Sequence, residues 1–105
     1  MNFVVLEKLP RLHDGYRQVI NLRGQRLLLL QDRGQLHLIA TRCPHAGFSL
    51  EKGTVRHGCI TCPKHGIVFD LDSGRAQGGE VFAGLEALTR YELIYRGTEV
   101  GVYVE

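Results

Sequence analysis

Two short groups of cysteine and histidine hold the residues of this 105-residue chain that are best suited to chemistry. The first is Cys43-Pro44-His45, and the second, after sixteen further residues, is Cys62-Pro63-Lys64-His65. Thiolates and imidazoles are metal ligands, so two matching loops that each offer one of both form a ligand set for a metal centre. A zinc finger usually takes its thiolates from one arm and its imidazoles from the other, whereas here each loop mixes the two ligand types.

The mixed loops suit a centre with two iron ions in unequal surroundings, because both sulfurs can bind one iron and both nitrogens the other. At these residues the chain resembles the Rieske [2Fe-2S] family, whose motif is C-x-H followed at a distance by C-x-x-H. The resemblance extends through Gly66 and the run Phe69-Asp70-Leu71-Asp72-Ser73-Gly74-Arg75. It implies a [2Fe-2S] cofactor whose four protein ligands are Cys43, His45, Cys62 and His65.

Two other interpretations of these residues stay open. The same four side chains can hold a zinc ion in a mixed Cys/His site, or they can be structural residues without a metal. Zinc has a filled d shell and lacks the visible charge-transfer bands of an iron–sulfur cluster. The colour of the purified protein therefore separates a cluster from the other two interpretations.

Length and charge are compatible with a small carrier. At 105 residues the chain is expected to form one domain, and 13 basic against 11 acidic residues give a net charge of +2, too weak to indicate nucleic-acid binding. The first eight residues lack the pattern of a secretory signal, and no apolar run approaches the length of a membrane span. We therefore expect a cytoplasmic protein without a membrane partner.

A third cysteine, Cys59, forms a C-x-x-C pattern with Cys62, which in a cytosolic chain can mark a redox pair of the thioredoxin kind. Such thiols take their reactivity from a helix N-terminus, whereas the run from Gly58 to Thr61 is typical of a short strand. Residues three apart on a strand point to opposite faces. We therefore expect Cys62 to bind metal and Cys59 to be a small buried apolar residue.

Four residues near the ligands distinguish the chain from the high-potential members of the family that it resembles. Respiratory Rieske proteins can join their two cluster loops by a disulfide and place a serine and a tyrosine hydroxyl near the cluster sulfurs. The disulfide positions hold Phe48 and Lys64 here, and the hydroxyl positions hold Ile67 and Phe69. The resemblance thus implies a disulfide-free domain, suited to a reducing compartment, with a low reduction potential on the order of −150 mV.

The remainder of the chain is predicted to be all-β. Apolar runs bounded by turn residues indicate strands over Tyr16–Leu22, Gln25–Gln31, Gln35–Ala40, Tyr91–Tyr95 and Glu99–Val104. Residues 85–91 have some helical propensity, but we expect a loop that passes into strand. The expected architecture is the Rieske iron–sulfur fold: one domain over residues 1–105, with an antiparallel β-sandwich base from residues 1–40 and 77–105 and an inserted cluster-binding subdomain from residues 41–76.

The resemblance implies a soluble one-electron carrier, and we do not expect an enzyme, since the sequence has no evident Ser-His-Asp set, phosphate loop or paired carboxylate site. The resemblance to soluble Rieske ferredoxins implies two partners, a flavin-dependent reductase and the terminal oxygenase of an aromatic-ring dioxygenase system. The run from Ala76 to Gly84 lacks the prolines that such ferredoxins often have there, which leaves the role of this loop open. The alternatives are a small Rieske subunit of a nitrite reductase and a zinc-bound interaction module without a redox role.

A rim of residues around the ligands is expected to line the cluster or to dock redox partners, and it comprises Pro44, Ala46, Gly47, Phe48, Lys64, Gly66 and Ile67. Four basic residues, Arg42, Lys52, Arg56 and Lys64, give this part of the chain a positive charge. They suggest an acidic surface on the partner, although an ordinary solvated face has the same composition.

Overall fold

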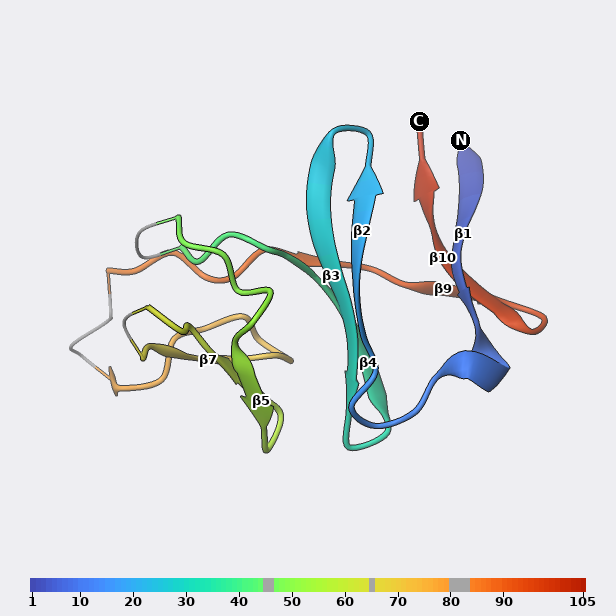
Figure 1. Cartoon of the computed structure of the whole chain (residues 1–105). Helices are drawn as coiled ribbons and strands as arrows, with labels where there is room; N and C mark the ends of the chain where they lie inside the picture. The colour runs from blue at the N-terminus through green and yellow to red at the C-terminus, as the bar shows by residue number, and fades with distance from the viewer. Residues whose placement is uncertain (45–46, 65, 80–83) are drawn as a thin grey trace.

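The computed structural model describes residues 1–44, 47–64, 66–79 and 84–105, and within these ranges the regular structure is antiparallel β-sheet with one short 3-10 helix, η1 (Leu9–Arg11), and no α-helix. Three sheets follow one another across the molecule (Figure 1). The first contains β1 (Asn2–Lys8), β10 (Glu99–Val104) and β9 (Ile94–Arg96); the second contains β2 (Arg17–Leu22), β3 (Gln25–Asp32), β4 (Gln35–Ala40) and β8 (Arg90–Tyr91); the third contains β5 (Thr54–Arg56), β6 (Cys59–Thr61) and β7 (Val68–Asp70). The predicted all-β class is confirmed. No described helix is long and apolar enough to cross a membrane.

Three tight hairpins set the order of the strands. The connections β2–β3, β3–β4 and β5–β6 each consist of two residues with positive φ, a non-glycine followed by glycine: Arg23-Gly24, Arg33-Gly34 and His57-Gly58. Positive φ at both central residues is the type I′ turn, whose twist matches that of the flanking strands. The strands predicted over Gln25–Gln31 and Gln35–Ala40 are therefore joined by such a turn, and the same turn recurs twice.

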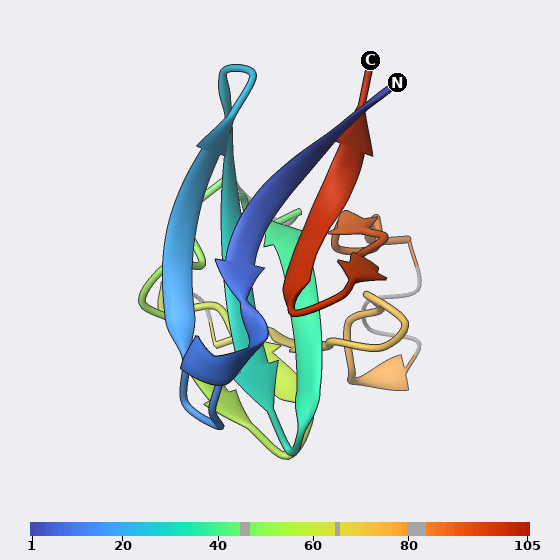
Figure 2. The same cartoon turned by 90° about the vertical axis from the view of Figure 1, so that its right-hand side faces the viewer.

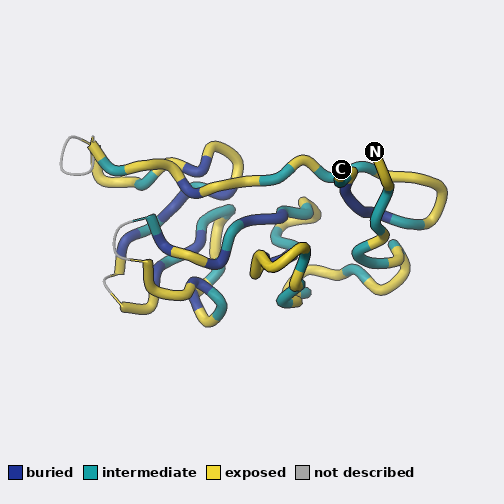
Figure 3. The backbone as a smooth tube through the Cα atoms, turned by 90° about the horizontal axis from the view of Figure 1, so that it is seen from above, coloured by how far each residue is buried: buried dark blue, intermediate teal, exposed yellow. Residues whose placement is uncertain are grey.

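Strand β3 is apolar along its middle because both of its faces are covered. Leu28 and Leu30 pack into a core with residues of β6 and β7, whereas Leu27 and Leu29 pack into a second core with Val102 of β10. Successive side chains of a strand point to opposite faces, so a strand buried on both sides requires a continuous apolar run. In Figure 3 the buried stretches lie in the interior and the hairpin tips are exposed.

The two ends of the chain form one sheet. Strand β1 pairs with β10 along its whole length, with a bulge between Val5 and Glu7, and Figure 2 shows the N- and C-termini side by side. The first and the last strand of the chain are therefore neighbours in one sheet.

The prediction of one strand over Tyr91–Tyr95 is wrong in one respect. This run is divided between two sheets: Tyr91 belongs to β8, which pairs with β4, and Ile94 belongs to β9, which pairs with β10. The intervening residues carry the chain from one sheet to the other. As predicted, residues 85–89 contain no helix.

Candidate metal centre

The two cysteine loops have the same backbone hydrogen bonds. In the first loop, the amide of Cys43 donates to the carbonyl of Phe48 (2.7 Å), and the amide of Gly47 donates to the carbonyl of Cys43 (2.8 Å). In the second loop, the amide of Cys62 donates to the carbonyl of Ile67 (2.8 Å), and the amide of Gly66 donates to the carbonyl of Cys62 (2.9 Å). Each cysteine thus begins a six-residue loop, and both the amide and the carbonyl of the cysteine form hydrogen bonds within that loop.

The residues that flank the loops are also equivalent. Arg42 and Ser49, which stand immediately outside the first loop, form an isolated antiparallel bridge. Thr61 and Val68, which stand immediately outside the second, are paired between β6 and β7. Each loop is therefore the end of a short antiparallel ladder, so the position of each cysteine is set by paired backbone.

Both cysteines are buried in one core. Cys43 is 1% exposed and Cys62 is fully buried, and they share a cluster of apolar side chains with Ile67, Phe69 and Leu28. Burial among apolar groups keeps water from the sulfurs and lowers the local dielectric. The same core contains residues of β3 and β4, so the cysteine loops pack directly against the central sheet.

The structure divides the expected rim into buried and exposed positions. Ile67 is buried and contributes no docking surface, whereas Gly47, Phe48, Lys64 and Gly66 are exposed and Pro44 is half-buried. The remaining predicted site residues, His45, Ala46 and His65, lie outside the described residues.

One contact between the loops could not be found in the sequence. The amine of Lys64 lies over the ring of Phe48, with Nζ 5.2 Å from the ring centroid.

The four basic residues noted in the sequence, Arg42, Lys52, Arg56 and Lys64, are all exposed. The guanidinium of Arg42 lies against Gly47, where a side-chain carbon would come within 2.9 Å of Nη2.

The third cysteine is separate from this pair. Cys59 is partly exposed, and its sulfur accepts a hydrogen bond from Nε2 of Gln77 (3.2 Å). Burial raises the pKa of the Cys59 thiol, with the nearby Asp70 carboxylate acting in the same direction. The expectation that Cys59 is a buried apolar residue is wrong: on β6 the alternate residue Ile60 is buried, whereas Cys59, on the opposite face of the strand, is only partly buried. A raised thiol pKa does, however, agree with the rejection of a thioredoxin-like pair.

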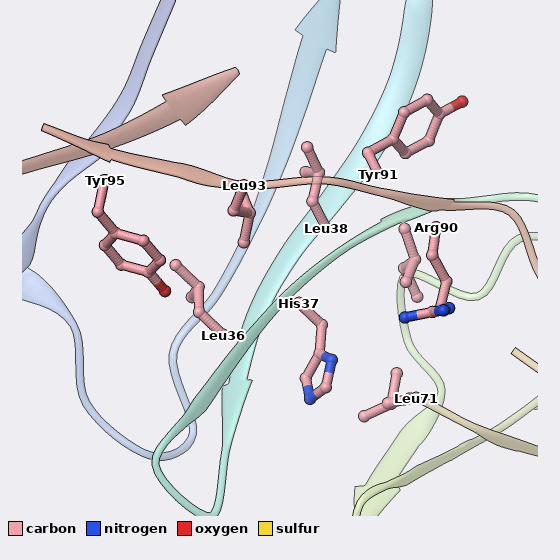
Figure 4. A pocket seen from close by; sticks show the side chains of 9 residues that line it. Leu36, His37, Leu38, Leu71, Arg90, Tyr91, Leu93 and Tyr95 are labelled. Carbon is pink, nitrogen blue, oxygen red and sulfur yellow. The ribbon is translucent and has the colours of Figure 1, made fainter. Parts of the chain in front are cut away.

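A hollow away from the cysteines is lined by His37 and Arg90, whose side chains point into it beside Leu71 (Figure 4). Its volume is about 250 Å³. Burial lowers the pKa of His37, and the carboxylate of Asp72 opposes this shift. A lowered pKa favours the neutral form of this imidazole, which lies on β4.

Residues 2–89 match the family of the Rieske [2Fe-2S] domain. The chain belongs to the Rieske family. Its cofactor is accordingly a [2Fe-2S] cluster, and its fold is that of a Rieske domain.

Several known proteins share this Rieske domain. Human apoptosis-inducing factor 3 is 33% identical over 82 residues, which is 78% of this chain but only 13% of the human protein. The ferredoxin of carbazole 1,9a-dioxygenase from Nocardioides aromaticivorans IC177 has the same fold, with a TM-score of 0.81 and 22% identity over the full length of both chains. A ferredoxin chain solved in complex with the oxygenase of a carbazole 1,9a-dioxygenase gives a TM-score of 0.80 at 23% identity, covering 95% of this chain and 91% of that one.

The described residues fit a Rieske cluster. Two equivalent loops present Cys43 and Cys62 in a common buried core, as a cluster with two sulfur ligands on one iron requires. The four-residue ligand set remains a prediction, since two of its members, His45 and His65, lie outside the described residues.

Proposed function

We propose that this Rieske protein is a one-electron carrier that passes electrons from a flavin-dependent reductase to a terminal oxygenase. The observation that carries the proposal is the full-length match to a ferredoxin whose chain is covered completely by this one. A ferredoxin with the same fold has been solved in complex with its oxygenase, which supports an oxygenase as the acceptor. A cytoplasmic location is part of the same proposal.

Cys43, His45, Cys62 and His65 would hold the cluster, which supplies a reversible one-electron couple when bound. The equivalent hydrogen bonds of the two loops fix the backbone on either side of each cysteine. A site whose backbone is fixed in this way reorganises little when its charge changes. An electron carrier needs a site that reorganises little, and it needs no substrate pocket beside the cysteines.

The side chains that replace the hydroxyl donors support a low potential. Ile67 is 5% exposed, Phe69 is fully buried, and both lie in the core that contains the cysteines. Neither can donate a side-chain hydrogen bond to sulfur, so the extra negative charge of the reduced cluster is stabilised less. We propose a potential near the low end of the Rieske range, on the order of −150 mV.

The exposed part of the rim is the proposed docking surface. It combines the ring of Phe48 with the amine of Lys64, and Arg42 extends the positive charge beside Gly47. An apolar centre with a basic border fits a partner surface that has an apolar centre and acidic residues around it. We also propose the division of the domain into a base (1–40 and 77–105) and a cluster-binding subdomain (41–76).

A small Rieske subunit of a nitrite reductase is the second candidate. The retained cysteines and histidines of both motifs favour a working carrier over a structural subunit. The zinc-bound module is disfavoured by the family match.

The test begins with the purified protein. We expect a coloured protein with two irons per chain and a Rieske-type EPR signal after reduction. Cys43→Ser and Cys62→Ser are expected to abolish the colour, whereas the matched control Cys59→Ser keeps it. The reduced protein is then mixed with an oxidised terminal oxygenase of the carbazole dioxygenase type, and reoxidation is followed by absorbance. A colourless protein with stoichiometric zinc contradicts the carrier, and a coloured protein that no oxygenase reoxidises contradicts the proposed acceptor.

A further inference from the structure

The two cysteine loops meet at the surface through one pair of side chains. Phe48 closes the first loop, since its carbonyl accepts the amide of Cys43, and Lys64 stands two residues after Cys62 in the second. The Lys64 amine lies over the Phe48 ring with Nζ 5.2 Å from the centroid. A cation within about 6 Å of an aromatic centroid is attracted by the negative face of the ring.

The anchoring of Phe48 makes this contact more than a chance approach of two surface side chains. Its backbone is fixed by the hydrogen bond to the Cys43 amide, and its neighbour Ser49 is held in the bridge to Arg42. Phe48 as a residue is 41% exposed, so more than half of its surface is covered, and the lysine stem can cover further apolar area. A contact to a residue whose backbone is already fixed loses less conformational entropy than one between two mobile residues.

We propose that Lys64 and Phe48 form a clamp that holds the two loops together and slows the escape of the cluster. The proposal rests on the proposed cluster site. A chelator reaches iron only when the loops part, so the rate of cluster loss follows the population of the open state. The contact contains no sulfur, and a thiol reductant therefore leaves the clamp intact.

The expected effect is modest and measurable. A cation–π contact at an exposed site is worth about 0.5–1 kcal/mol, which corresponds to a two- to fivefold change in the open population. Lys64→Met removes the charge and keeps the apolar stem, and Phe48→Leu removes the ring face and keeps an apolar side chain. Each change alone should accelerate cluster loss about two- to fivefold, and the double variant should lose it no faster than either, because one contact is removed in all three.

The measurement is the decay of visible absorbance of the loaded protein in excess chelator, with circular dichroism to verify the fold. Lys52→Met is the matched control, since Lys52 is an exposed lysine of the same part of the chain and its replacement changes the net charge equally. We expect Lys52→Met and Lys64→Arg to decay like the wild type, and Phe48→Trp to decay more slowly because indole binds cations best.

Equal acceleration by Lys52→Met and Lys64→Met would overturn the clamp, and so would losses that multiply in the double variant. These outcomes differ from failure of the proposed function, in which the wild-type protein itself lacks the iron and the colour.

Discussion

Gly74 follows the cluster-binding strands at a point where even one added carbon meets backbone. Its φ is +79°, and a Cβ built on it would lie 2.6 Å from the carbonyl oxygen of Leu88. The carbonyl of Gly74 also accepts the amide of Leu88 (2.7 Å), and Leu88 lies in the core that contains both cysteines. Gly74→Ala is therefore expected to push the segment around Leu88 away from the core.

The cost can be separated into two parts with a matched control. Gly34 has a similar φ of +74°, but nothing lies within 4 Å of its Cβ position. The left-handed backbone costs either alanine about 1–2 kcal/mol, part of which is offset by the stiffer unfolded chain. Gly34→Ala should thus cost about 1 kcal/mol. Gly74→Ala should lose in addition a hydrogen bond of about 1 kcal/mol and part of the burial of Leu88, another 1–2 kcal/mol or so.

Thermal unfolding of the two loaded variants at one scan rate measures the difference. For a chain of this size we expect the Tm to fall by about 5 °C in Gly34→Ala and by more than about 10 °C in Gly74→Ala. Gly74→Ala should also release its cluster faster, because Leu88 shares a core with Cys43 and Cys62. Equal Tm values for the two variants would refute the argument that the Leu88 carbonyl excludes a side chain at position 74.

Two further substitutions test the cysteine core and a half-buried tyrosine. Phe69→Tyr adds a hydroxyl to that core. A hydrogen bond from this hydroxyl to sulfur that is about 1 kcal/mol stronger in the reduced state would raise the midpoint potential by about 40 mV. Protein-film voltammetry measures the potential, and an unchanged value contradicts the argument that the missing hydroxyl at position 69 lowers it. The Tyr16 hydroxyl donates to Oε2 of Glu7 at 2.7 Å, and burial together with this carboxylate raises the pKa of Tyr16 from 10.0 to about 12. Wild-type stability should therefore decline as the pH rises from 10.0 through about 12. Tyr16→Phe should lower the free energy of unfolding by about 1 kcal/mol at neutral pH. In urea unfolding, the stability of this variant should also fall less steeply above pH 10.0 than that of the wild type, and parallel pH profiles of the two proteins would contradict the argument.

The family, the cofactor and the hairpins could be predicted because each has a local signal. The cysteine and histidine groups are contiguous in sequence, and glycine at the second turn position marks the connection after Arg33. The run Leu27–Leu30 indicated a strand but not its place between two cores. A continuous apolar run indicates that both faces of a strand are covered but does not say which segments cover them, so only the tertiary structure shows β6 and β7 on one face and β10 on the other.

The misjudged positions depend on contacts between distant segments. The run Tyr91–Tyr95 is apolar enough for one strand, and it divides because β4 and β10 offer pairing partners in different sheets. Cys59 was expected to be a small buried apolar residue on a strand, yet its side chain stays partly exposed on the middle strand of the small sheet, where Gln77 reaches its sulfur. Neither the change of sheet nor the side chain of Gln77 leaves a signal near these residues in the sequence.

The equivalence of the two loops clarifies what the unequal motifs mean. The histidine stands two residues after Cys43 but three residues after Cys62, which suggests loops of different length. The hydrogen bonds contradict this: each loop ends at the fifth residue after its cysteine, at Phe48 and Ile67, and has glycine at the fourth. The difference between C-x-H and C-x-x-H is therefore a difference of histidine position within loops of one length.

The residues that end the two loops differ in burial, although the backbone hydrogen bonds of the loops are the same. Ile67 is buried beside the cysteines, whereas Phe48 is exposed and lies against Lys64. One end thus belongs to the core and the other to the surface through which a partner would meet the domain.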